Sequence, residues 1–226
     1  MKKVSSTLGS IDQNALSQQI YERLKANVLN GSFAFHERLS TEDLAAHFQV
    51  SAMPVRDALK LLEADGLVEI VPRRGAFVTS VGREDVEEIF QIRQIIECAA
   101  VENLAFLADA IIEQLRTVLQ QMEALRVGES YSDYPQYVQL DARFHNLIVA
   151  IPANTRLSEL YQGLHWPIQL LLVLSKSEHQ RARQTMDEHG AIVDALVARD
   201  VAKAQLVIST HLRNAQADLI SRVPAT

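Results

Sequence analysis

The chain has 226 residues, of which 48% are apolar, 22% charged and 6% aromatic, which is the composition of a soluble globular protein. No apolar run is long enough to cross a bilayer, and the N-terminal lysines are followed by no apolar stretch of the kind found in a secretory signal. The single Cys98 excludes a disulfide framework and a CxxC-type zinc site. We therefore expect a cytoplasmic protein with no membrane partner, and the 8 glycines and 6 prolines favour helices.

The net charge of −6 is unevenly distributed along the chain. Residues 1–80 contain 9 Lys and Arg and 9 Asp and Glu, so this segment is neutral. Residues 81–226 contain the other 13 basic and 19 acidic residues, so this segment carries the entire net charge of −6. An acidic protein argues weakly against a polyanionic partner, but the acidic excess lies outside the first segment. Nucleic-acid binding by residues 1–80 therefore stays open.

Helical patterning begins after a polar tail, residues 1–14, which we expect to be flexible. Apolar residues then recur every four positions and predict a helix from Ala15 to Leu29, which Gly31 ends. These apolar positions are Leu16, Ile20, Leu24 and Val28. A loop leads from this helix to Ser40.

Two short helices follow, separated by about three residues, which is the spacing of a helix-turn-helix. Ser40 can cap the first helix, with Asp43 three residues later as in a capping box. Ser51 can cap the second helix, and Pro54 is tolerated in its first turn. Gly66 ends the second helix.

After the second helix, the spacing of apolar residues changes from that of a helix to that of a strand. Residues 67–71 and 76–79 are predicted strands, joined by a turn with Arg73 and Arg74 at its tip. A helix-turn-helix followed by a hairpin with a basic tip indicates a winged helix, which we assign to residues 15–80. The second helix of such a unit can lie in the major groove of DNA.

The N-terminal end of the second helix and the tip of the wing supply candidate DNA contacts. Arg56 is the best base reader, because a guanidinium group can bind guanine O6 and N7 together. Lys60 and the wing arginines suit phosphates or the minor groove. One arginine alone would more simply be a solvated surface residue, but the helix spacing, the caps and the basic wing together favour DNA binding. The predicted DNA-binding residues are Ser51, Met53, Arg56, Lys60, Arg73 and Arg74.

The rest of the chain, residues 81–226, shows helical patterning and no competing strand pattern. We predict helices at 84–107, 109–126, 133–150, 155–176, 178–198 and 200–221. The expected fold class is therefore mainly α, with an N-terminal winged helix-turn-helix and a C-terminal all-helical bundle.

The predicted bundle contains a set of possible metal ligands. Asp141 and His145 lie four residues apart on one helix face. His189 comes 11 residues before Asp200 and His211 comes 11 residues after it, so a helical hairpin turning at Asp200 would bring the two rings level.

One carboxylate and three imidazoles suit a divalent ion such as zinc, nickel or manganese. A five- or six-coordinate ion would keep positions for water or an effector carboxylate. The alternative is a buried Asp141–His145 pair with two unrelated core histidines. The level pair of His189 and His211 favours the metal.

Two long segments resemble known bacterial domains. LSTEDLAAHFQVSAMPVRDALKLLEADGLVEIVPRRGAFV resembles the DNA-binding domain of GntR-family transcription regulators, with Ala52 and Met53 where the family pattern has arginine and threonine. IFQIRQIIECAAVENLA, LDARFHNLIVAIPANTRLSELY and EHGAIVDALVARDVAKAQLVISTHL resemble the FadR-type C-terminal (FCD) domain.

These resemblances imply a ligand-responsive transcription regulator, not an enzyme, that binds palindromic double-stranded operator DNA as a homodimer. They imply that Asp141, His145, His189 and His211 hold the metal and that the effector is a small carboxylate. Arg93 matches an arginine that commonly faces the effector pocket, although it can also pair with Glu97 on its own helix.

Two other functions stay open at this point. One is a DNA-binding protein with a purely structural metal site. The other is a metal-dependent hydrolase, which the absence of an HExxH motif, a phosphate loop and a nucleophile elbow disfavours.

Overall fold

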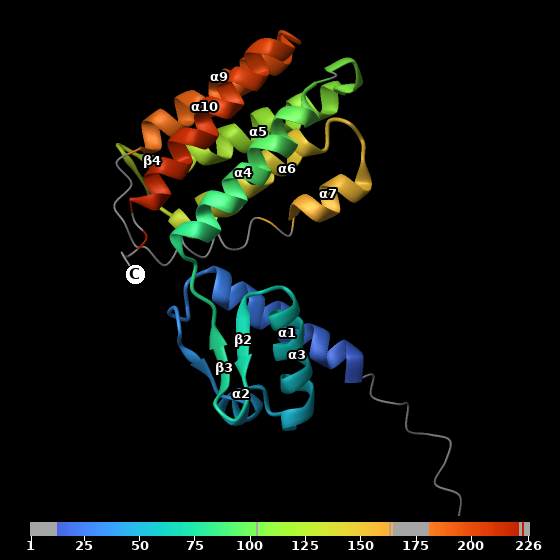
Figure 1. Ribbon diagram of the computed structural model, residues 1–226, viewed down its shortest axis with the longest axis vertical. Coiled ribbons are helices and arrows are strands. Elements are labelled where there is room, and N and C mark those ends of the chain that lie inside the picture. The colour runs from blue at the N-terminus through green and yellow to red at the C-terminus, as the bar shows by residue number, and fades with distance from the viewer. Residues whose placement is uncertain (1–12, 103, 163, 165–180, 222, 224–226) are drawn as a thin grey trace, which may run out of the picture. The chain divides into compact units, whose positions relative to one another are not determined.

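The computed structural model describes residues 13–102, 104–162, 164, 181–221 and 223 (Figure 1). Residues 1–12 of the tail expected over 1–14, and the helical residues expected within 165–180, lie outside the described part. Gln13 and Asn14, expected to belong to the tail, are helical. The chain divides into two compact units between Thr79 and Ser80. No described helix is long and apolar enough to cross a membrane.

The N-terminal unit is a winged helix-turn-helix, as the sequence predicts. Its helices and strands are α1 (Gln13–Leu29), β1 (Arg38–Leu39), α2 (Thr41–Phe48), α3 (Ala52–Ala64), β2 (Val68–Val71) and β3 (Gly75–Val78). Helix α3 packs against α1 and α2 through a continuous buried face. That face consists of Pro54, Val55, Ala58, Leu59 and Leu62. The spacing of these residues leaves the opposite side of α3 facing solvent.

The segment before α2 was expected to be a loop, and this expectation is wrong. Arg38 and Leu39 form β1, which pairs antiparallel with β3, so the sheet has the order β1-β3-β2. The cause is tertiary: His36 adopts a positive φ of 62° and its backbone N–H donates to the carbonyl oxygen of Val78. This bond draws the segment alongside β3.

The helix ends of this unit agree only partly with the expected caps. The Ser40 hydroxyl accepts a hydrogen bond from the backbone N–H of Asp43 at 3.2 Å. Ser51 has the extended backbone of an N-cap residue, but its side chain makes no capping hydrogen bond. Gly66 follows α3 with a φ of 80°, a conformation that favours glycine.

The C-terminal unit is a bundle of helices (Figure 1). Helix α4 packs against α6 and α10, α5 against α6 and α9, and α9 against α10. The helices are α4 (Arg83–Ala100), α5 (Asp109–Leu125), α6 (Tyr134–Val149), α7 (Thr155–Gln162), α9 (Ala182–Val197) and α10 (Val201–Ile220). As expected, Asp200 caps α10, because its carboxylate accepts from the backbone N–H of Lys203 at 2.9 Å.

Two local predictions for this unit are corrected. The helix expected to reach residue 107 ends at Ala100, and a 3-10 turn, Leu104–Phe106, follows. The Arg199 guanidinium donates to the carbonyl oxygens of Leu104 and Leu107, which holds this turn out of the helix.

The second correction concerns the prediction that no strand occurs after residue 81. β4 (Arg126–Val127) and β5 (Ser130–Tyr131) form a small hairpin. Gly128 supplies the positive φ of 64° that its two-residue turn needs.

Candidate functional site

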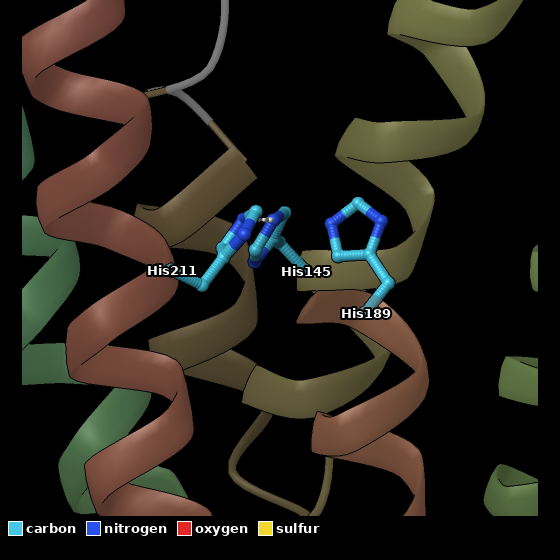
Figure 2. A group of neighbouring side chains, drawn as sticks. All are labelled: His145, His189 and His211. Carbon is cyan, nitrogen blue, oxygen red and sulfur yellow. Dashed lines mark hydrogen bonds between the residues drawn. The ribbon is translucent and has the colours of Figure 1, made fainter. Parts of the chain in front are cut away.

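Three imidazole rings from three helices meet inside the C-terminal bundle (Figure 2). His145 lies on α6, His189 on α9 and His211 on α10, and all three are buried. One ring nitrogen from each lies within 4.8 Å of the others, and the Nε2 atoms of His145 and His211 are 3.3 Å apart. The rings of His189 and His211 lie level across the hairpin, with centroids 4.6 Å apart. The hairpin argument from Asp200 predicts this geometry.

Asp141 lies at the edge of this histidine cluster, which consists of His145, His189 and His211. Its Oδ1 atom is 3.4 Å from Nε2 of His189 and 3.9 Å from Nε2 of His145. Its side chain is 17% exposed, whereas the three rings have almost no contact with solvent. The structure thus brings all four predicted ligands together, with the carboxylate on the more open side.

Two further carboxylates contact the outer ring nitrogens of the histidine cluster. The Nδ1 atom of His145 lies 2.7 Å from Oε2 of Glu97, and the Nδ1 atom of His211 lies 2.9 Å from Oε2 of Glu188. An Nδ1–H that donates to a carboxylate leaves the Nε2 atom of a neutral ring free to accept or to bind a metal. Both carboxylates therefore orient an Nε2 lone pair toward the centre of the cluster.

Glu97 is the most deeply buried charge of this arrangement. Its other oxygen, Oε1, accepts from Nε of Arg93 at 2.9 Å and from the hydroxyl of Tyr161. Burial alone would raise the pKa of Glu97, but the adjacent His145 and Arg93 outweigh it and hold this pKa well below its usual range. Glu97 is therefore an ionised carboxylate that accepts from three partners.

Sequence reasoning missed the contacts of Glu97 and Glu188 with the histidines. A signal existed for Glu97, because the inward stripe of α4 carries it together with Arg93. This stripe consists of Val86, Phe90, Arg93, Glu97 and Ala100. No such signal existed for Glu188, which precedes His189 in the sequence but binds His211 on the next helix.

His189 differs from the other two histidines because neither of its ring nitrogens has a hydrogen-bond partner among the described residues. Burial, and then the neighbouring rings of His211 and His145, lower its pKa well below the usual value. The pKa of His211 is also lowered, chiefly by burial. A buried neutral imidazole with two unsatisfied nitrogens is costly unless something binds it.

The donor set fits a first-row divalent metal ion. Zinc–nitrogen bonds of about 2.1 Å in a tetrahedral arrangement place ligand atoms about 3.4 Å apart. The Nε2 atoms of His145 and His211 are 3.3 Å apart, and Oδ1 of Asp141 lies 3.4 and 3.9 Å from Nε2 of His189 and His145, so these separations are near this value, while the three histidine nitrogens all lie within 4.8 Å of one another. The absence of a hydrogen bond to either ring nitrogen of His189 among the described residues is the second observation that fits a bound ion.

A small cavity of about 60 Å³ opens beside the cluster. Asp141 and His211 line it, as do Arg93 and Arg181. Aromatic side chains form much of the remaining wall, and Tyr131 stacks on Tyr137 with ring centroids 3.8 Å apart. A molecule in this cavity would touch two of the predicted metal ligands.

The structure combines both interpretations of Arg93. Its Nε atom pairs with Glu97, as the spacing of four residues suggested, and its guanidinium also lines the cavity. Its Nη2 atom is buried and has no partner in the described part of the chain. One donor of this arginine therefore stays available to a ligand.

The predicted DNA-binding residues all have exposed side chains. Met53 is 61% exposed at the start of α3, and Arg56 follows it on the same side of the helix. Lys60 pairs with Asp57 at 3.2 Å, and both side chains remain exposed. Arg73 and Arg74 lie in the β2–β3 turn, where Arg73 has a φ of 65°. The six residues therefore occupy solvent-facing positions on α3 and the wing.

Comparisons with known proteins agree with the two units. Residues 16–78 match the family described as bacterial regulatory proteins, gntR family, and residues 88–214 match the FCD domain. The chain belongs to the GntR family of bacterial transcription regulators, in the group with a C-terminal FCD effector-binding domain.

Individual relatives support this membership. The chain is 30% identical to the uncharacterized HTH-type transcriptional regulator YdhC of Bacillus subtilis, over 87% of each chain. It is 27% identical to the HTH-type transcriptional repressor RspR of Escherichia coli, over 88% of this chain and 86% of the other. A crystal structure of a putative GntR regulator from Rhodococcus shares the fold, with a TM-score of 0.81 and 24% identity over 92% of this chain and 98% of the other. These families and relatives are transcription regulators and not enzymes, so the hydrolase alternative is not retained.

Proposed function

We propose that this regulator binds a palindromic operator as a homodimer and senses a small organic acid at a metal ion held by Asp141, His145, His189 and His211. The observation that carries the proposal is the convergence of these four donors beside a cavity that also contains Arg93. Zinc, nickel and manganese all suit such a donor set. The ion would supply a Lewis-acidic position for one oxygen of the effector.

A metal ion explains the cluster better than a shared proton does. A proton could bridge the Nε2 atoms of His145 and His211, which are 3.3 Å apart. It would leave both nitrogens of His189 without a partner. A divalent ion can engage all three rings and the Asp141 carboxylate at once.

Effector binding can influence DNA binding only if the effector prefers one form of the protein. Helix α4 carries Arg93 and Glu97, and it begins four residues after the junction between the two units. A ligand that draws Arg93, in the middle of α4, toward the metal would therefore act on the helix that follows the segment leading to the DNA-binding unit.

Thermal unfolding of the whole protein tests the proposal. Protein stripped by a chelator should unfold at a lower temperature than protein with added zinc, nickel or manganese, since a ligand of the native state stabilises it. Short carboxylic acids should raise the unfolding temperature only of the metal-loaded protein. Acid binding that survives chelation would leave the metal with a purely structural role.

Replacing Arg56 with alanine is expected to weaken operator binding about 5- to 150-fold, since a bidentate contact to guanine contributes about 1–3 kcal/mol. The loss should be greatest for operators that contain the contacted guanine. Fluorescence anisotropy with labelled operator DNA measures it. Arg23→Ala, which removes an exposed arginine on α1, is the matched control. If affinity fell equally for operator and random DNA, the result would show that Arg56 contacts a phosphate and not a base.

An exposed apolar face on α4 and α10 supports the proposed dimer. Ile95 is 64% exposed on α4 and Leu206 is 62% exposed on α10, and these two helices pack together. Such a face is typical of an interface between protein chains. Ile95→Glu is expected to convert the dimer to a monomer and weaken operator binding, as size-exclusion chromatography with light scattering would show. Val127→Glu, at an equally exposed position on β4, should leave the dimer intact.

A further inference from the structure

We infer that Arg38 on β1 is a further DNA-binding residue, which binds a backbone phosphate together with the wing arginines Arg73 and Arg74. This inference rests on the proposed binding of operator DNA by the N-terminal unit, and it is independent of the metal and the effector. It depends on which face of the wing sheet carries Arg38, on where the guanidinium group lies, and on the charges around it.

The sheet of the wing has one buried and one exposed face. Leu39 of β1 pairs with Ala76 of β3, and both side chains are buried. Successive side chains of a strand point to opposite faces, so the neighbouring pair, Arg38 and Phe77, lies on the other face. Arg38 is exposed there and Phe77 is half-buried. Arg38 is therefore a surface residue of the wing, although it precedes the helix-turn-helix in the sequence.

The side chain of Arg38 extends across β3 to the end of the wing turn. A Cβ atom added to Gly75, the first residue of β3, would lie 3.1 Å from Nε and 3.8 Å from Cζ of Arg38. The guanidinium group thus occupies the space that a side chain at this position would fill. Arg73 and Arg74 directly precede Gly75 in the β2–β3 turn. A cation from β1 therefore lies at the base of the turn that carries the two wing arginines.

Arg74 lies on the same face of the sheet. Its Cζ atom is 5.8 Å from the ring centroid of Phe77, which is the cross-strand partner of Arg38. One guanidinium group lies over Phe77 and the other over Gly75, two residues earlier on β3. Two cations from separate parts of the chain therefore share one small exposed surface.

The charges of this surface are not matched by carboxylates. Among the described residues, Arg38, Arg73 and Arg74 form no ion pair and no side-chain hydrogen bond. Glu69 shares the exposed face, but it lies on β2, on the other side of Phe77 from Arg38. Neighbouring cations repel one another, and a phosphate group placed between them replaces this repulsion with charge-assisted hydrogen bonds.

The position of these arginines suits contact with the same DNA that α3 would bind. The β2–β3 turn lies at the end of the N-terminal unit where α3 begins (Figure 1). A duplex that receives the N-terminal end of α3 in its major groove would therefore bring its backbone toward the wing. Phosphate contacts fix the position of a protein on DNA and carry no sequence information. We therefore expect Arg38 to contribute affinity and not specificity.

The salt dependence of DNA binding by the full-length protein tests the inference. The probes are a labelled duplex that the wild-type protein selects from a random pool and a labelled duplex of mixed sequence. Fluorescence anisotropy measures their affinities between about 50 and 200 mM salt. Arg38→Gln is expected to weaken binding to both duplexes equally, about fivefold for each bound subunit. The slope of log K against log salt should fall by about 0.9 for each bound subunit, whereas Arg38→Lys should retain most of the slope.

Two controls accompany this measurement. Arg23→Gln removes an exposed arginine on α1 and makes the same change of charge, and it should leave the slope as in the wild type. Thermal unfolding of Arg38→Gln should match that of the wild type, because Arg38 makes no side-chain hydrogen bond among the described residues.

The outcomes separate this inference from the proposed function. A slope for Arg38→Gln equal to that for Arg23→Gln would overturn the inference and leave operator binding intact, whether or not the unfolding temperature changes. A loss of affinity confined to the selected duplex would show that Arg38 reads a base, and would also overturn it. Failure of the wild-type protein to select any DNA from the pool would contradict operator binding itself.

Discussion

Replacing Glu97 with alanine is expected to lower the free energy of unfolding by about 3–5 kcal/mol, the typical effect of removing one partner from a buried ion pair. Glu97 is inaccessible to solvent and accepts from Arg93, His145 and Tyr161. Its loss leaves the buried Arg93 guanidinium without a counterion and the Nδ1 atom of His145 without an acceptor. Urea unfolding of the metal-free protein, followed by circular dichroism, measures the change.

Two variants serve as controls for this prediction. Glu97→Gln keeps the shape and one acceptor oxygen, so its destabilisation should be smaller than that of Glu97→Ala. Glu87→Ala removes an exposed carboxylate that pairs with Arg83 on the same helix, and it should change the free energy of unfolding by less than about 1 kcal/mol. If Glu97→Ala were no more destabilising than Glu87→Ala, the buried carboxylate would not be needed to hold α4 against α6.

Replacing His189 with leucine is expected to abolish the stabilisation by metal while leaving the metal-free protein at least as stable as the wild type. The reason is the unusual position of this ring, which is buried with neither nitrogen hydrogen-bonded in the described structure, although Nε2 lies 3.4 Å from Oδ1 of Asp141. Leucine removes two unsatisfied polar atoms and keeps an apolar side chain against Phe144, whose ring centroid lies 4.5 Å from that of His189. Most core substitutions are destabilising, so an unchanged or raised unfolding temperature would be diagnostic.

The metal contribution can be measured in the same variant. At a free metal concentration 1,000 times its dissociation constant, binding stabilises the native state by about 4 kcal/mol. Wild-type protein should show this gain as a rise in unfolding temperature with zinc, and His189→Leu should show almost none. His145→Leu is a useful contrast, because it also removes a proposed ligand but leaves Glu97 without its histidine partner, and so it should destabilise even the metal-free protein. An equal zinc-induced shift in His189→Leu and wild type would exclude His189 as a ligand.

Local patterns in the sequence were sufficient for the helix-turn-helix, the wing and most helices of the bundle. Periodicity of apolar residues, capping residues and turn glycines act within a few positions of one another, so they can be read from one sequence. The pairing of two histidines could also be predicted from the sequence, since equal spacing on either side of Asp200 places His189 and His211 level in any hairpin that turns there. Asp141 and His145 followed from their separation of four residues on one helix.

Contacts between elements distant in the sequence were decided by the tertiary structure alone. Glu188 reaches the ring of His211 on the next helix, Arg199 holds the turn after α4 out of the helix, and the β4–β5 hairpin brings Tyr131 onto Tyr137. That one buried donor of Arg93 has no hydrogen-bond partner among the described residues likewise depends on which groups lie beside its guanidinium. Helical spacing specifies which face a side chain occupies, but its partner depends on how the helices pack, and that packing is set by the whole core.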